Sequence, residues 1–228
     1  DISSVLMALT PAARAALETL LPICKEYNLA AIAFSITGRG ILSRRYAEGH
    51  VFATGDIRRM DPLFKHERFD SALRIRERLA KLGEDYDATA VQMGIAWVLA
   101  QPQVACALTG TSSPTHLAEN LAASEINLAN ADLDALNTFL AQEDTRLSAA
   151  QRVIIRHILE TQLSSDPEAA FNDLAYVMET VVSLGMASEG EVMTTFMELF
   201  SLRKALDENA WRKMQGIQHY LRGMISGV

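Results

Sequence analysis

The spacing of apolar residues changes type near residues 143–148, and this change constrains the fold more than any other feature of the chain. Before it, short apolar runs typical of buried strands alternate with stretches that have the three-to-four-residue spacing of helices. After it, only the helical spacing remains. We therefore expect two parts: an α/β domain, residues 1–146, and a four-helix domain, residues 147–228.

The first part contains three predicted strands, at residues 4–9, 29–34 and 104–108. Helical patterns lie between and after them, at 13–27, 69–82, 89–100, 114–121 and 132–141, the last with Asn130 as the expected N-cap. Strands that alternate with helices are typical of a parallel sheet. A sheet of three strands leaves its edges and one face uncovered. We therefore expect either a homo-oligomer or a partner chain that covers them.

The second part contains four predicted helices, at 149–163, 167–184, 189–204 and 208–224. Each predicted start carries a capping residue: Ser148 with Gln151, Asp166 before a proline, Ser188 with Glu191, and Asp207. These side chains accept hydrogen bonds from the first free N–H groups of a helix. Amphipathic helices on short connections favour a small bundle.

The composition argues against several classes of function. The 228 residues include 21 Lys+Arg against 28 Asp+Glu, a formal net charge of −7, which disfavours binding to nucleic acid or to an anionic membrane. Cys24 and Cys106 form neither a disulfide framework nor a set of metal ligands, and no apolar run is long enough to span a bilayer. The first residue is Asp rather than Met, so the question whether a targeting segment precedes it stays open. By default we take the protein as cytoplasmic.

Small and polar residues follow the second predicted strand. Ser35 and Thr37 supply hydroxyls, and Gly38 and Gly40 allow unusual backbone conformations. Arginines stand in and after this loop, at 39, 44, 45, 58 and 59, and residues 42–65 lack any periodicity, as expected of a long functional loop. Backbone N–H groups together with arginines would form a cradle for a diphosphate. The simpler interpretation is a solvated loop.

A second loop, Gly110-Thr111-Ser112-Ser113, follows the third predicted strand and precedes a helix. A helix N-terminus binds anions through its unpaired N–H groups and its dipole. Glu119 and Asn120 lie one turn further on, where they are positioned to read a base or a ribose. The alternative is that Ser112 or Ser113 only caps the helix and Gly110 only forms a turn.

Five segments resemble, in the same order, the C-terminal half of an aldo/keto reductase across about residues 13–140. They are 20–29, 33–42, 55–64, 89–101 and 110–120. The resemblance implies a partial (β/α) barrel with about three parallel strands, followed by an all-α bundle, and a fold that is rich in helices. We identify no family for residues 147–228.

The resemblance also implies a dinucleotide cofactor, NADP or NAD. The residues that would bind it are Ser35, Thr37, Gly38, Gly40, Leu42, Arg45, Gly110, Thr111, Ser112, His116, Glu119 and Asn120. Ser112 stands where NADPH-selective members often have Arg or Lys, so the choice between NADP and NAD stays open.

The catalytic Tyr, Lys, Asp and His of that family lie on the first half of the barrel, and no residue of this chain can be aligned with them. Two hypotheses follow. In the first, the chain is the cofactor-binding C-terminal part of an NAD(P)H-dependent carbonyl oxidoreductase and is inactive by itself. In the second, the half barrel is a non-catalytic scaffold, and the helical domain mediates self-association or binding to a partner.

Overall fold

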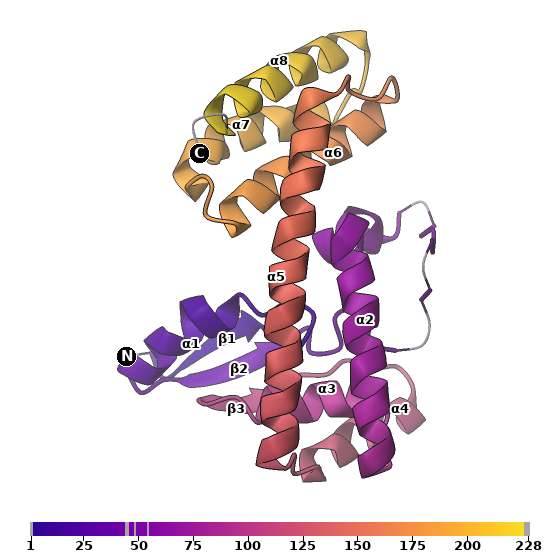
Figure 1. The fold of residues 1–228 in the computed structure, drawn as a ribbon, viewed down its shortest axis with the longest axis vertical. Helices are drawn as coiled ribbons and strands as arrows, with labels where there is room; N and C mark the ends of the chain where they lie inside the picture. Colours follow the sequence, from indigo (N-terminus) through magenta and orange to yellow (C-terminus); the bar gives the residue numbers. More distant parts are fainter. Residues whose placement is uncertain (1, 44–45, 48, 54, 226–228) are drawn as a thin grey trace. The chain divides into compact units, whose positions relative to one another are not determined.

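The computed structural model describes residues 2–43, 46–47, 49–53 and 55–225. The chain divides into two compact units, Asp1–Asp144 and Thr145–Val228. Figure 1 shows the strands and helices of the first unit in indigo to pink and the helices of the second in orange to yellow.

The first unit is built around a parallel sheet of three strands, in the order β1-β2-β3. Its elements, in chain order, are β1 (Ser4–Ala8), α1 (Ala16–Glu26), β2 (Ala30–Phe34), the short 3-10 helices η1 (Ile57–Met60) and η2 (Pro62–Phe64), α2 (His66–Gly83), η3 (Glu84–Tyr86), α3 (Ala90–Leu99), β3 (Val104–Ala107), α4 (Pro114–Ala122), η4 (Ala123–Glu125) and the start of α5 (Asn130–Glu160). The predicted fold class, a partial barrel with parallel strands followed by helices, is confirmed.

The two faces of this sheet differ in burial. Met7, Ala31 and Ala33 point to one face and belong to the hydrophobic core. On the other face, Leu6 pairs with Ile32, and Leu6 is 58% exposed. Side chains alternate between faces along a strand, so a run of apolar residues gives two apolar faces. Only one of them is covered by this unit's core.

Helix α3 and the first turns of α5 contribute buried residues to the first unit's core. The hydroxyl of Thr89 accepts from the Gln92 amide, and the Gln92 side chain accepts in turn from the Thr89 amide, so α3 begins with a capping box. Trp97 is buried, and its indole N–H donates to the Asn137 side-chain oxygen at 2.8 Å.

Helix α5 corrects the sequence-based boundaries. It is one helix of 31 residues, Asn130–Glu160, where two helices at 132–141 and 149–163 were expected. Asn130 is its first residue rather than its N-cap, and Ser148 with Gln151 starts no helix. The stretch has no Gly or Pro and several alanines, so nothing in it interrupts the helix. A capping-box pattern inside such a stretch therefore does not indicate the start of a new helix.

The second unit combines the last turns of α5 with α6 (Pro167–Ser183), α7 (Glu189–Leu202) and α8 (Glu208–Ile225). The capping predictions for Asp166, Ser188 and Asp207 are confirmed: each side chain accepts from a backbone N–H of the helix that follows. Leu174, Val177, Met214 and Leu221, among others, form a separate core. Two apolar side chains of this unit, Val153 and Phe200, are exposed.

Candidate cofactor site

The two loops singled out in the sequence begin side by side at one edge of the sheet. β2 and β3 are parallel neighbours, so their carboxyl ends meet at the same edge. The Leu108 amide donates to the Ala33 carbonyl at 2.7 Å, which continues this pairing beyond β3. Loops at the carboxyl edge of a parallel sheet form the ligand sites of α/β folds. The candidate site is therefore the region bounded by residues 35–42 and 108–113.

The first loop is a series of tight turns. Four of its residues have positive φ, namely Ser35, Gly38, Arg39 and Gly40, with values of 57°, 58°, 54° and 90°. The Gly38 amide donates to the Ser35 carbonyl at 2.7 Å, and the Gly40 amide donates to the Thr37 carbonyl at 3.2 Å. These N–H groups are used inside the loop. Donors for a ligand at this loop would therefore have to come from the Ser35 and Thr37 hydroxyls rather than from these two glycine amides.

Gly38 and Leu42 have packing roles in this loop. A Cβ on Gly38 would lie 2.6 Å from a methyl carbon of Ile41, which leaves no room for a side chain. The φ of Gly38 is also positive, so both space and backbone conformation favour glycine here. Leu42 is buried, and its side chain lies against Gly94 of α3: a Cβ there would lie 2.6 Å from a Leu42 methyl. Leu42 thus anchors the loop on α3 rather than presenting its side chain to a ligand.

Two arginines of the predicted anion cradle, Arg39 and Arg58, have acidic partners. Arg39 forms an ion pair with the buried Asp61. Arg58 binds Asp56 through two nitrogens, at 2.5 and 2.8 Å, and this interaction raises the pKa of the guanidinium. Arg44 and Arg45, the latter a predicted cofactor contact, lie outside the described residues. An anion at Arg39 or Arg58 would have to compete with a carboxylate.

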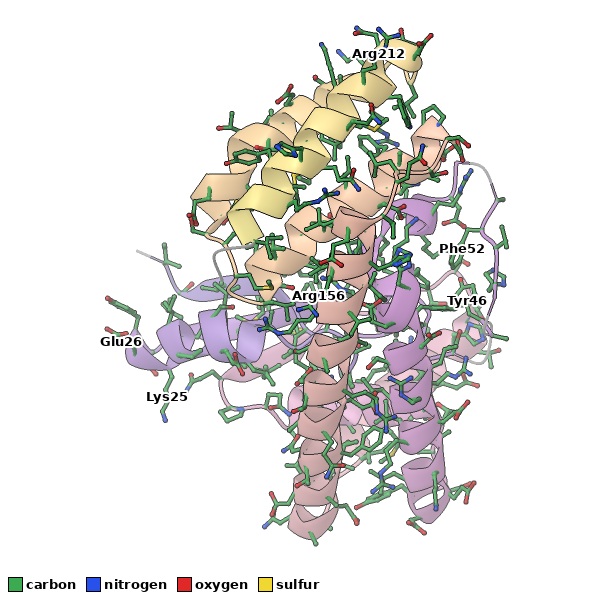
Figure 2. The ribbon with its side chains drawn as sticks, turned by 45° about the horizontal axis from the view of Figure 1, so that its top comes forward. Lys25, Glu26, Tyr46, Phe52, Arg156 and Arg212 are labelled. Atoms are coloured by element: carbon green, nitrogen blue, oxygen red, sulfur yellow. The ribbon has the colours of Figure 1, made fainter. Side chains whose placement is uncertain are left out.

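The long loop before α2 contains an aromatic cluster that we did not predict from the sequence. Tyr46 lies 4.9 Å from His50 and 5.3 Å from Phe52, between ring centroids, and Phe52 lies 5.0 Å from Phe64. The Arg58 guanidinium lies over the rings of Tyr46 and Phe52, at 5.3 and 5.1 Å. Figure 2 labels Tyr46 and Phe52 on this segment. Aromatic residues in an otherwise polar stretch were the signal that could have revealed it.

The second loop leads directly into α4. The Ser113 hydroxyl accepts from the His116 amide at 3.3 Å, and the Thr111 hydroxyl accepts from the Ser113 amide at 3.1 Å. Ser113 is therefore the N-cap, as one interpretation predicted, and Ser112 is not. Thr111, Ser112 and His116 are exposed. A Cβ on Gly110 would meet nothing within 4 Å, so this edge of the site is open.

Glu119 and Asn120 occupy different environments. Asn120 is buried, and its amide group donates to the Thr109 hydroxyl at 2.8 Å, so it fixes the start of the second loop. Glu119 is exposed, and its backbone carbonyl accepts from the Gln92 side chain at 3.1 Å. The carboxylate of Glu119 is thus the group of the pair that can reach a ligand. Asn120 instead holds the start of the second loop in place through its bond to Thr109.

Known proteins similar to this chain match its first unit. The sequence model of the aldo/keto reductase family matches residues 1–141, a longer stretch than the expected 13–140. An aldo-keto reductase of Strobilurus tenacellus is 34% identical over 124 residues, covering 54% of this chain and 37% of that protein. An aldo-keto reductase of Schizosaccharomyces pombe, named with NADP(+), is 30% identical over 112 residues, covering 49% of this chain and 33% of that protein.

A solved structure supports the fold. The glycerol dehydrogenase of Gluconobacter oxydans aligns with a TM-score of 0.56 and 24% identity, covering 61% of this chain and 42% of that one. The chain spans about a third of the length of the curated relatives it matches. The family match extends over more than half of the chain and holds all three strands and both loops of the candidate site. The chain therefore belongs to the aldo/keto reductase family.

Proposed function

We propose that the first unit is the nucleotide-cofactor-binding part of an NAD(P)H-dependent carbonyl oxidoreductase. The observation that carries this proposal is the meeting of two hydroxyl-rich loops at the carboxyl edge of β2 and β3, inside the stretch that matches the family. The open space beside Gly110 leaves room for a ligand at the second loop.

The donor set suits a dinucleotide. The Ser35 and Thr37 hydroxyls would donate to the diphosphate, and the N-terminus of α4 would attract a phosphate on the adenosine side. The Glu119 carboxylate would accept from a ribose hydroxyl or a base amino group. Ser112 and His116, both exposed, would contact a 2′-phosphate or a ribose, so NADP and NAD both fit. When bound, the nicotinamide would supply or accept a hydride.

Turnover requires groups beyond these loops. In the family, a general acid Tyr and its Lys, Asp and His partners come from the first half of the barrel. We propose that this half is supplied by another chain or segment, which would cover the exposed sheet face on which Leu6, Ile32 and Cys106 are paired across the strands. Barrel interiors are filled by side chains, so this face needs such a cover.

A second candidate function is the non-catalytic scaffold. It is favoured by the acidic partners of Arg39 and Arg58 and by the use of the Gly38 and Gly40 amides inside their own loop. Each of these interactions lowers the number of donors that a diphosphate would meet. In this alternative, the helical unit carries the function through self-association or partner binding.

Titration with NADPH and NADH separates the two candidates. We expect saturable binding, followed by nicotinamide fluorescence, that raises the thermal midpoint of the first unit. Gly110→Val should weaken binding at least about tenfold, because its side chain would fill the open space without disturbing the fold. The matched control is Gly216→Val, which alters an equally open glycine in α8. No binding at millimolar nucleotide would favour the scaffold.

A turnover assay tests the missing catalytic groups separately. The purified chain should not oxidise NADPH in the presence of a panel of aldehydes and ketones, even where it binds the nucleotide. Carbonyl-dependent oxidation by this chain alone would contradict the proposal that another chain or segment supplies the acid.

A further inference from the structure

Helix α7 presents a second apolar stripe, on a different side from the one that packs inside its unit. Val192 and Leu199 are buried. Met193, Met197 and Phe200 are 44%, 62% and 47% exposed. The spacing of four and then three residues puts these three side chains on one face of the helix. Contiguous exposed apolar faces are typical of surfaces that contact another molecule.

The stripe has the shape of a docking surface. The Phe200 ring is stacked on Phe196, with centroids 6.1 Å apart, and the Arg203 guanidinium lies 5.7 Å from its centre. Met197 and Phe200, together with Ser201, Arg203 and Lys204, line a hollow at the C-terminal end of the stripe. Methionine side chains adapt to the shape of an opposing surface. The hollow is wide enough for an apolar side chain from outside to enter.

The charges at the two ends of the stripe have opposite signs. Glu189 stands one turn before Met193, and Lys204 stands one turn after Phe200; both are exposed. If a second α7 packs antiparallel on the first, Glu189 of each copy comes opposite Lys204 of the other. In the same register Met193 lies opposite Phe200, and Met197 meets Phe196 near the two-fold axis. The stripe is therefore complementary to itself in charge and in apolar character.

We propose that α7 is the surface through which two copies of this chain associate, as an antiparallel pair about a two-fold axis. A two-fold contact requires one patch that matches itself, and the α7 stripe meets that condition. Met193 of one copy enters the hollow beside Phe200 of the other, as knobs enter holes in paired helices. The pairing needs neither a cofactor nor added barrel strands, so it is independent of the proposed nucleotide binding, and it specifies a surface for the self-association named in the scaffold alternative.

Sedimentation velocity of the full chain between about 5 and 200 µM tests the pairing, because interfaces at the lower end of the size range are weak and associate at about micromolar concentration. We expect a shift from monomer to dimer across this range. Met197→Lys should weaken the dimer at least about tenfold, because it puts two ammonium groups near the axis. Val153→Lys, at a 67% exposed position of α5 in the same unit, is the matched control and should leave the dimer unchanged. A dimer that persists in Met197→Lys overturns the proposal.

Charge exchange tests the antiparallel register. Glu189→Lys and Lys204→Glu should each weaken self-association, because each brings like charges together at both ends of the pair. An equimolar mixture of the two variants should regain the dimer, since both contacts become complementary. Circular dichroism confirms that each variant keeps its helices. No recovery in the mixture, or a monomer at every concentration of the parent chain, overturns the proposal.

Discussion

The two units of this chain use their apolar residues in opposite ways. In the helical unit, every helix contributes an apolar side to a shared core in which Leu174 and Met214 are fully buried, although α7 also has a second apolar stripe that is exposed. In the α/β unit, the strands are apolar on both faces, and Leu6 and Phe34 stay 58% and 38% exposed. A helix buries one stripe, whereas a strand of a parallel sheet needs cover on two sides. A helical segment can therefore complete its own core where a barrel fragment cannot.

This comparison can be tested because each unit holds one of the two tryptophans. Trp97 reports on the first unit, and Trp211, whose indole N–H donates to the Ser164 carbonyl at 2.9 Å, reports on the second. Replacing either one by Phe leaves fluorescence from a single unit.

The largest expected effects come from the two cores. Leu174→Ala should lower the free energy of unfolding of the helical unit by about 2–5 kcal/mol, and Leu79→Ala should do the same for the α/β unit, because each removes a fully buried side chain. Urea unfolding, followed by the single remaining tryptophan, should show each change in its own unit. If both signals shift equally for both variants, α5 joins the units into one cooperative structure.

A smaller loss is expected at the buried carboxylate of Glu143. Its Oε2 accepts from the Ser71 hydroxyl at 3.1 Å and from two Arg74 nitrogens at 3.0 and 2.9 Å. Arg74→Met should destabilise the first unit by about 2–3 kcal/mol, because the charge stays buried with fewer partners. Arg212→Met, which breaks an exposed ion pair with Glu208, should cost less than about 0.5 kcal/mol. If urea unfolding shows the same loss of free energy for Arg74→Met and Arg212→Met, burial of the carboxylate does not decide the strength of these ion pairs.

Tyr86 links η3 to the start of α5 and should show a pH dependence. Its hydroxyl donates to Asp132 at 2.6 Å and accepts from the Ala129 amide at 2.9 Å, and the bond to Asp132 raises the pKa of the phenol above 10. The contribution of this hydrogen bond to the stability of the fold is complete below pH 10 and is lost as the pH rises through the raised pKa of Tyr86. Tyr86→Phe should cost about 1 kcal/mol near pH 7 and remove this alkaline loss. Thermal midpoints of variant and parent between pH 7 and 11 measure both the loss near pH 7 and the alkaline decline. If the midpoints of the two proteins fall equally with pH, the Tyr86–Asp132 hydrogen bond is not the cause of the decline.

The smallest effect concerns the capping box of α7. The Ser188 hydroxyl and amide both donate to the Glu191 carboxylate at 2.6 Å and lower its pKa from 4.5. The stabilisation is present above pH 4.5 and is lost as the pH falls through the lowered pKa. Glu191→Gln keeps the hydrogen-bonding shape without the charge, so its thermal midpoint should vary less between pH 6 and 3. A parallel decline of variant and parent would show that the carboxylate is not responsible.

Much of the fold could be predicted from local pattern. The three parallel strands follow from apolar runs that end at Pro or small residues, and the starts of α6, α7 and α8 follow from Asp166, Ser188 and Asp207. The continuity of α5 was missed, because Ser148 and Gln151 match a capping box although neither Gly nor Pro ends the helix there. Local signals identify residues that can cap a helix, but neighbouring turns decide whether the helix stops.

The residues of the candidate site also separate into those that local sequence predicts and those whose role depends on the tertiary structure. The sequence by itself determined the family and the two loops with their candidate hydroxyls on Ser35, Thr37 and Thr111, because these depend on residue type and order along the chain. Only the tertiary structure decided that the distant Asp61 neutralises Arg39 and that Leu42 and Asn120 are buried supports. It also revealed the exposed stripe of α7. Burial and ion pairing depend on which distant residues meet in space, and no spacing within one element specifies that meeting.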